Sequence, residues 1–180
     1  KYVRAKQLAD EGALGEVYYV RQLECHFGPH SDWFWDVERS GGGVLMDMGC
    51  HSIAYCRWVF GDTPIESVYA EAGNFVHKER TKGDDHAVVT LRFAPTERHP
   101  NGGLGIAENS WARIGGLDDR AEIYGSKGLT VAVVFTDIKD WNDVRMMQPR
   151  RGPRLAVKPF QMRRVRRRPS RQHLERHVPP

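Results

Sequence analysis

The sequence predicts an α+β fold, an open and mostly antiparallel sheet with a helix on one face and no Rossmann domain. A strand-like run at residues 16–27 precedes a helix-like run at residues 44–60. Several strand-like runs joined by turn signals then follow, an order typical of helix packed on an antiparallel sheet. The length of 180 residues, with 40% hydrophobic and 28% charged residues, suits about one globular domain.

The first third of the chain supplies a helix end, a strand and a long loop. Residues 1–12 read as the end of a helix that we expect to begin in a missing N-terminal region, and a glycine closes it. Residues 16–27 are rich in Tyr, Val and Leu and predict a strand. Residues 28–43 predict a loop with two tryptophans and four glycines, three of them consecutive, and loops of this length are more often functional than idle.

The clearest helix is predicted over residues 44–60, where apolar side chains recur at helical spacing. We expect Leu45, Met48, Tyr55 and Val59 to point into the sheet. A glycine and then a proline follow as helix-stop signals.

Alternating patterns predict the remaining strands, since successive side chains of a strand point to opposite faces. These strands are expected at residues 66–75, 86–93, 105–114, 120–124 and 130–134. We therefore expect the domain to span residues 13–134.

The basic charge belongs to the end of the chain. Residues 145–180 hold 12 Lys and Arg with one acid, whereas the remainder holds 15 Lys and Arg against 22 acids. A nucleic-acid-binding function for the whole protein is therefore not predicted. Residues 137–147 have weak helical character, and we expect residues 135–180 to be a basic, irregular tail because an Arg-dense segment without apolar periodicity has little to bury.

Three interpretations of this tail remain open. It is a phosphate-binding extension, a solvated charged tail, or a non-native continuation produced by a shifted reading frame. The third explains the abrupt change of composition without a new function. Nucleic-acid binding is least favoured because no aromatic residue interleaves the arginines.

The cysteines and the hydropathy of the sequence indicate the cellular compartment, and the spacing of cysteines and histidines is the test for a metal site. No apolar run approaches the roughly 18 residues of a membrane span, and three irregularly spaced cysteines fit a reducing compartment, so we expect a cytoplasmic protein. The spacings around Cys25, His26, His30, Cys50 and His51 match no common zinc pattern. Neighbouring strand residues such as Cys25 and His26 also face opposite sides, and no metal site is predicted.

The candidate site is the segment from Ser40 to His51. Three consecutive glycines there permit close approach to the main chain. Asp47 and His51, four residues apart, are neighbours on a helix surface, and a carboxylate beside an imidazole can act as a general acid–base unit. The alternative is a helical ion pair at the rim of the core.

Other candidates carry weaker signals. Trp33 and Trp35 are interpreted as sugar-stacking platforms or, equally, as half-buried loop anchors. Arg39 is a candidate contact for an anionic group or a solvated loop residue. The pair Asp84–Asp85 is expected to cap a turn rather than to bind metal.

The segment from Ser40 to His51 resembles the central motif of the glucose–fructose oxidoreductase/inositol dehydrogenase (Gfo/Idh/MocA) family, which has three glycines, then Asp, then His four residues later. The resemblance extends over about residues 12–132. Gly12–Val17 is similar to the entry to the family's second domain. Trp33–Asp36 and Ser40–Gly43 are similar to its substrate loop. Its later strands are resembled by Asp84–Ala87, Ser110–Trp111 and Ala121–Gly128.

This resemblance implies a two-domain oxidoreductase. A Rossmann domain binds NAD or NADP, and a second open-sheet domain provides contacts with a sugar or cyclic polyol and with other subunits. By resemblance, His51 moves the proton of the substrate hydroxyl and Asp47 assists it. The resemblance also implies a homo-oligomer formed through the sheet.

The sequence departs from the family pattern at both ends. No Gly-x-Gly-x-x-Gly lies between a strand and a helix, so the cofactor-binding residues are unknown and we expect the chain alone to be inactive. The strand and helix that close the family's domain are not evident after residue 132. Two other functions stay open, namely a non-catalytic oligomerisation or carbohydrate-binding module on the same fold, and a related NAD-dependent glycosidase.

Overall fold

A computed structural model describes residues 1–114, 116–135 and 144–147. They belong to a compact unit of residues 1–149. Most of the predicted irregular tail, residues 136–143 and 148–180 of the range 135–180, lies outside the described residues.

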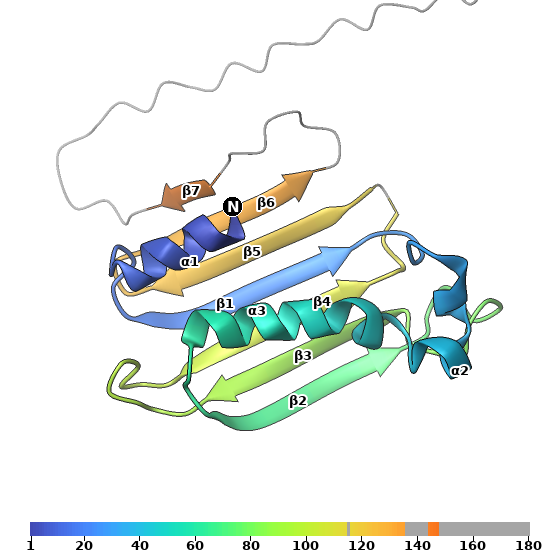
Figure 1. Cartoon of the computed structure of the whole chain (residues 1–180), viewed down its shortest axis with the longest axis horizontal. Coiled ribbons are helices and arrows are strands. Elements are labelled where there is room, and N and C mark those ends of the chain that lie inside the picture. The colour runs from blue at the N-terminus through green and yellow to red at the C-terminus, as the bar shows by residue number, and fades with distance from the viewer. Residues whose placement is uncertain (115, 136–143, 148–180) are drawn as a thin grey trace, which may run out of the picture. The chain divides into compact units, whose positions relative to one another are not determined.

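Seven strands of the described part form one sheet in the order β2-β3-β4-β1-β5-β6-β7 (Figure 1). Five of the six neighbouring pairs are antiparallel, and only β1 and β4 run parallel. The prediction of an open, mostly antiparallel sheet in an α+β fold is confirmed. The strands are β1 (Val17–Cys25), β2 (Ile65–Gly73), β3 (His86–Phe93), β4 (Gly103–Ser110), β5 (Asp118–Gly125), β6 (Gly128–Phe135) and β7 (Val144–Met147).

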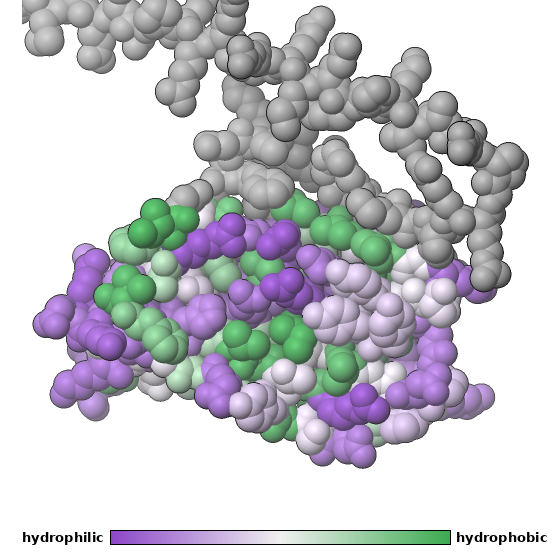
Figure 2. Space-filling model, turned by 180° about the vertical axis from the view of Figure 1, so that it is seen from behind, coloured by the Kyte–Doolittle hydropathy of each residue, from purple (hydrophilic) through white to green (hydrophobic). Residues whose placement is uncertain are grey.

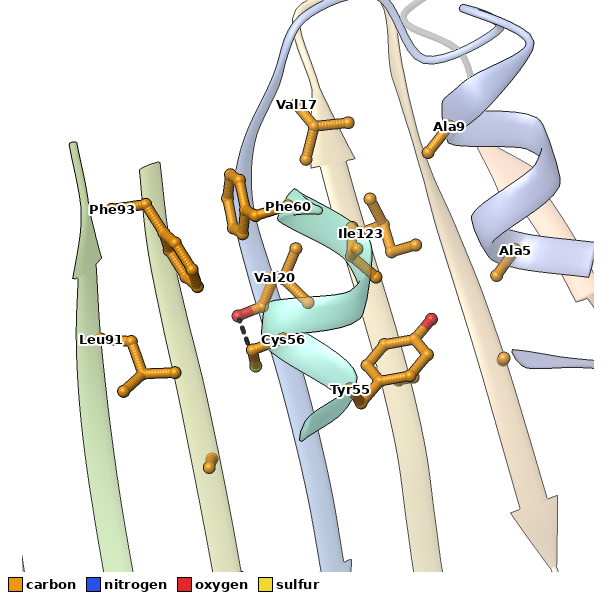
Figure 3. Close-up of a cluster of buried hydrophobic side chains, with 14 of the residues drawn as sticks. Ala5, Ala9, Val17, Val20, Tyr55, Cys56, Phe60, Leu91, Phe93 and Ile123 are labelled. Carbon is orange, nitrogen blue, oxygen red and sulfur yellow. Dashed lines mark hydrogen bonds between the residues drawn. The ribbon is translucent and has the colours of Figure 1, made fainter. Parts of the chain in front are cut away.

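Helices α1 (Tyr2–Asp10) and α3 (Cys50–Phe60) cover one face of this sheet (Figure 1). Their apolar sides meet the strands in one core, which includes Ala5 and Ala9 of α1 and Val20 and Ile123 of the sheet (Figure 3). Burying a valine or isoleucine side chain contributes about 1.5–3 kcal/mol. The burial of these side chains therefore determines which side of each helix faces the sheet.

The predicted helix phase is confirmed. Met48, Tyr55 and Val59 are buried, and Leu45 is half-buried against the core. The helix is not a uniform α-helix, however, because residues Leu45–Gly49 form a π-helical turn, η2, before α3 begins. Such a turn contains an extra residue and occurs frequently at functional sites.

The long loop after β1 has local structure of its own. It contains a short 3₁₀ helix, η1 (Asp32–Trp35), and one turn of helix, α2 (Val37–Ser40). The Asp36 side chain accepts a hydrogen bond from the Glu38 N–H and so caps α2. This bond fixes the start of α2.

The segment after β6 differs from the sequence-based expectation. Residues Val144–Met147, expected to be weakly helical and irregular, form strand β7, which pairs antiparallel with β6. The exposed edge of β6 offers unpaired backbone groups, and pairing with this edge satisfies them whatever the side chains are.

The opposite face of the sheet, shown in Figure 2, carries mixed side chains rather than a helix layer. Cross-strand register places Tyr19, Arg21, Ile106, Glu108 and Tyr124 on it, and we call these five residues the open face. An ion pair of 2.5 Å joins Arg21 and Glu108. Among the described residues, no helix has the length and apolar character needed to cross a membrane.

Candidate functional site

The chain between β2 and β3 folds around one buried carboxylate. Asp85 has no exposed surface, and its oxygens accept hydrogen bonds from the backbone N–H groups of Phe75, Val76 and His77 at 2.7–2.8 Å. The His77 ring then donates to the carbonyl oxygen of Trp111 (2.9 Å), and the Trp111 N–H donates to the Asp85 carbonyl (2.8 Å). The prediction that Asp85 caps a turn agrees with this geometry, and the turn fixes Trp111.

Trp111 in turn holds Asp47. Its indole ring is completely buried against Val44, Met48 and Ala87, and its Nε1–H donates to Asp47 Oδ2 at 3.2 Å. Asp47 lies in η2 and is half-buried. A charged acceptor makes this bond stronger than a neutral one. The packing of Trp111 therefore fixes the orientation of this carboxylate.

His51 lies in the first turn of α3 and is solvent-exposed. The hydrogen bond that Asp47 receives comes from Trp111 and not from His51. The structure therefore brings the two residues of the predicted acid–base unit to the same short stretch of helix. It does not join them by that bond.

Two of the three glycines in the motif have structural duties. Gly41 ends α2 with a φ of 79°, a conformation that side chains disfavour. A Cβ on Gly43 would lie 2.0 Å from the carbonyl oxygen of Asp84, because the two segments cross here. The backbone N–H of Val44 donates to the same carbonyl oxygen at 2.8 Å. The space beside Gly43 is therefore filled by protein and is not a cradle for a pyrophosphate.

The predicted loop residues occupy different environments. Trp33 is 41% exposed and stacks one ring face on Phe34, with centroids 3.9 Å apart. Trp35 is half-buried, and the Arg80 guanidinium lies over its ring at 4.2 Å, which is a cation–π contact. This contact favours the anchor interpretation for Trp35. Arg39 is exposed in α2.

A second cluster lies at the end of β1. It consists of Glu24, His26 and His30. Each residue offers one atom that could bind a metal, a carboxylate oxygen or a ring nitrogen, and these three atoms lie within 4.8 Å of one another. The rings of His26 and His30 are 4.4 Å apart at their centroids. His26 Nδ1 lies 2.6 Å from the carbonyl oxygen of Gly28, to which it donates. The other ring nitrogen, Nε2, is buried without a hydrogen-bond partner.

The electrostatics of this cluster favour neutral groups. Burial, followed by the nearby charge of Asp119, raises the pKa of Glu24. Burial, followed by the neighbouring His30, lowers the pKa of His26. Both shifts arise because the charged form loses solvation when it leaves water.

Sequence reasoning missed both Glu24 and the role of Trp111. It compared Cys25 with His26 and did not consider that Glu24 and His26, two residues apart across the end of β1, bring their ligand atoms together. The spacing Glu24-x-His26 followed by His30 was the available signal. The bond between Trp111 and Asp47 joins residues 64 positions apart, and no local pattern indicates it.

Comparison with protein families gives one clear match. The model described as the GFO/IDH/MocA C-terminal domain matches residues 2–131, which is well over half of the chain. The matched region ends in β6 and contains the complete site described above.

Curated relatives share this region. The chain is 32% identical over 145 residues to myo-inositol 2-dehydrogenase of Thermotoga maritima, covering 76% of the chain and 40% of that protein. It is 34% identical over 133 residues to the uncharacterized oxidoreductase YrbE of Bacillus subtilis, covering 73% of the chain and 36% of that protein. The chain thus spans about two fifths of the length of the relatives it matches.

Solved structures agree with these relatives. GenD2 from gentamicin A biosynthesis, solved in complex with NAD, superimposes with a TM-score of 0.66 at 32% identity. That match covers 83% of this chain and 44% of GenD2. A myo-inositol dehydrogenase from Sinorhizobium meliloti, whose assignment is provisional, matches with a TM-score of 0.61 at 28% identity, covering 72% and 37% of the two chains.

Proposed function

The chain belongs to the GFO/IDH/MocA family of oxidoreductases, whose C-terminal domain it carries, and from this premise we propose that it is the substrate-binding and catalytic half of a nicotinamide-dependent dehydrogenase. The proposed substrate is a sugar or cyclic polyol. The relatives named for inositol and the NAD complex of GenD2 support this class of substrate and cofactor. The observation that carries the proposal is the fixed position of Asp47 beside the exposed His51.

The proton chemistry is assigned to these two residues. Removal of hydride from an alcohol carbon requires a base for the hydroxyl proton. His51 is exposed and carries an imidazole, the side chain most often used as a general base, so we assign that proton to it. Asp47, held by the indole of Trp111, is assigned the role of positioning carboxylate on the same stretch of helix. General acid–base catalysis of this kind contributes about 10²–10⁴ in rate.

The cofactor is not bound by the glycine motif of this chain. The space at Gly43 is occupied by the backbone of Asp84, and no described strand runs through a glycine-rich turn into a helix in the manner of a dinucleotide site. NAD or NADP would accept the hydride when bound by a Rossmann domain. We assign only substrate binding and proton movement to the described residues, and we propose that the chain alone is inactive.

Substrate contacts are assigned to the loop after β1. Trp33 has one free ring face and is a candidate platform for the C–H surface of a sugar ring. The exposed guanidinium of Arg39 is a candidate donor to an anionic or hydroxyl group. Trp35 is the weaker candidate, since Arg80 already covers its ring.

A homo-oligomer formed through the open face is also proposed. This face presents aromatic, aliphatic and paired charged side chains, and no helix of the described residues lies over them (Figure 2). An Ile106→Arg substitution at its centre should lower the mass measured by light scattering to that of a monomer. An unchanged oligomer would reject this interface, and a monomeric wild-type chain would reject the oligomer.

We further propose a cytoplasmic location, which the three free cysteines support.

The functional proposal is tested first at the gene. A reading frame that joins a Gly-x-Gly-x-x-Gly strand–turn–helix to Lys1 supports the dehydrogenase. A start codon directly before Lys1 supports the non-catalytic module. The joined protein should reduce NAD or NADP with myo-inositol or another polyol. Titration calorimetry of the 180-residue chain with either cofactor should show no micromolar binding, and a clear micromolar isotherm would contradict the proposal.

A further inference from the structure

We propose that Glu24, His26 and His30 bind a divalent transition-metal ion, with Zn²⁺ as the first candidate. Their ligand-type atoms lie within 4.8 Å of one another in the described structure. Ligands of a tetrahedral zinc ion lie about 3.3 Å apart, given bonds of about 2.0–2.1 Å. His30, the exposed member of the three, has the most freedom to move toward the other two.

His26 has the geometry of an oriented metal ligand. Its Nδ1–H donates to the Gly28 carbonyl oxygen at 2.6 Å, so the proton sits on Nδ1 and the lone pair on Nε2. The side chain is only 7% exposed, and Nε2 has no hydrogen-bond partner. A buried acceptor without a partner costs about 1–3 kcal/mol. Metal-binding histidines commonly donate their other ring N–H to a backbone carbonyl, as His26 does.

The backbone brings the three residues together. Glu24 and the residue two positions on, His26, project from the same face at the end of β1. Gly28 then turns the chain with a φ of 73°, and its N–H is tied to the Trp111 carbonyl oxygen at 2.8 Å. This turn places the His30 ring 4.4 Å from that of His26. The cluster is therefore built on a central strand and an anchored turn.

The ligand set favours zinc over magnesium or calcium. Two imidazole nitrogens and one carboxylate suit Zn²⁺ and related transition metals, whereas Mg²⁺ and Ca²⁺ prefer oxygen ligands. Three protein ligands also leave a fourth position open, as in catalytic rather than structural zinc sites. A role in holding a substrate hydroxyl rests on the proposed function, but metal binding itself does not.

Zinc titration of the full 180-residue chain tests the site. His173 and His177, which lie outside the described residues, are replaced by alanine in every protein so that they add no imidazole. After treatment with EDTA, calorimetry should show one Zn²⁺ per chain, and Co²⁺ should give the ligand-field absorption of a site with nitrogen ligands. Excess Mg²⁺ should not compete.

Variants separate this site from adventitious binding. His30→Ala removes an exposed ring and should leave the fold intact while weakening Zn²⁺ binding at least tenfold, and Glu24→Gln should do the same. His86→Ala, on β3, is the matched control and should change the affinity less than twofold. Absence of stoichiometric binding, or equal losses in His30→Ala and His86→Ala, would overturn the proposal. Neither outcome bears on the dehydrogenase assignment, which is tested by cofactor reduction.

Discussion

Asp85 is predicted to be the most costly single polar side chain to change in the described part. The substitution is Asp85→Asn, which keeps the size of the side chain and removes its charge. The wild-type carboxylate accepts three backbone N–H groups at 2.7–2.8 Å, and none of its surface is exposed. The amide has one acceptor oxygen, and its NH₂ group would face N–H donors instead.

The expected loss follows from these bonds. A hydrogen bond to a charged group contributes about 1.5–3 kcal/mol, so loss of the charge and of about two acceptor contacts should cost about 3 kcal/mol. The matched control is Asp84→Asn. The Asp84 side chain is half-buried and accepts a single backbone N–H, that of Leu45, at 2.8 Å, and its loss should cost about 1 kcal/mol.

The pH dependence of this effect has a definite sign. Burial alone would raise the pKa of Asp85, but the three backbone N–H groups outweigh burial and lower it. In the unfolded chain the pKa of an aspartate is about 3.9. A group whose pKa is lower in the folded chain stabilises the fold at pH values above the unfolded pKa, and this stability is lost as the pH falls through the folded pKa. The difference between wild type and Asp85→Asn should therefore be full at pH 7 and shrink below about pH 4.

Urea unfolding followed by tryptophan fluorescence measures both quantities. The free energy of unfolding of wild type, Asp85→Asn and Asp84→Asn is compared at pH 7 and then at falling pH. If Asp85→Asn costs no more than Asp84→Asn, the three backbone bonds do not stabilise this turn. The account of how Trp111 is positioned would then be wrong.

Two further predictions concern the site and the cysteines. Trp111→Phe removes the N–H donor to Asp47 and leaves a small void. The free energy of unfolding measured in urea should therefore fall by about 2–4 kcal/mol. An unchanged midpoint would contradict the packing described. Ellman's reagent should modify one thiol of the native chain rapidly, the exposed Cys50, because burial raises the pKa of both Cys25 and Cys56 to about 12. Rapid reaction of two or three thiols would show that the core is open.

Local patterns in the sequence were sufficient for most of the fold. Alternation in residues 86–93 gave the bounds of β3, and helical spacing placed Met48 and Val59 in the core. Periodicity did not reveal the π-helical turn at Leu45–Gly49, because the turn lies at the start of the helix and too few apolar positions precede it to show a break in phase. Strand β7 was missed because edge pairing depends on backbone groups rather than on side-chain pattern.

The candidate site was only partly predictable for a similar reason. Asp47 and His51 were found because they are four residues apart in the sequence. The contact of Asp47 with Trp111 forms only when the helix packs on the assembled sheet, and this long-range contact leaves no local signal in the sequence. Glu24 and His26 had a local signal, a spacing of two residues in a strand, whose meaning became clear only when the turn at Gly28 brought His30 back to them.

The most direct test of the central claim is the effect of His51→Ala on kcat in the protein that includes the dinucleotide-binding domain. Formation of NADH or NADPH is followed with a saturating polyol, and His86→Ala serves as the matched control on β3. Our account predicts that kcat falls about 10²–10⁴-fold for His51→Ala, the usual contribution of a general acid–base, and stays near wild type for the control. A folded His51→Ala protein that keeps wild-type kcat would contradict the assignment.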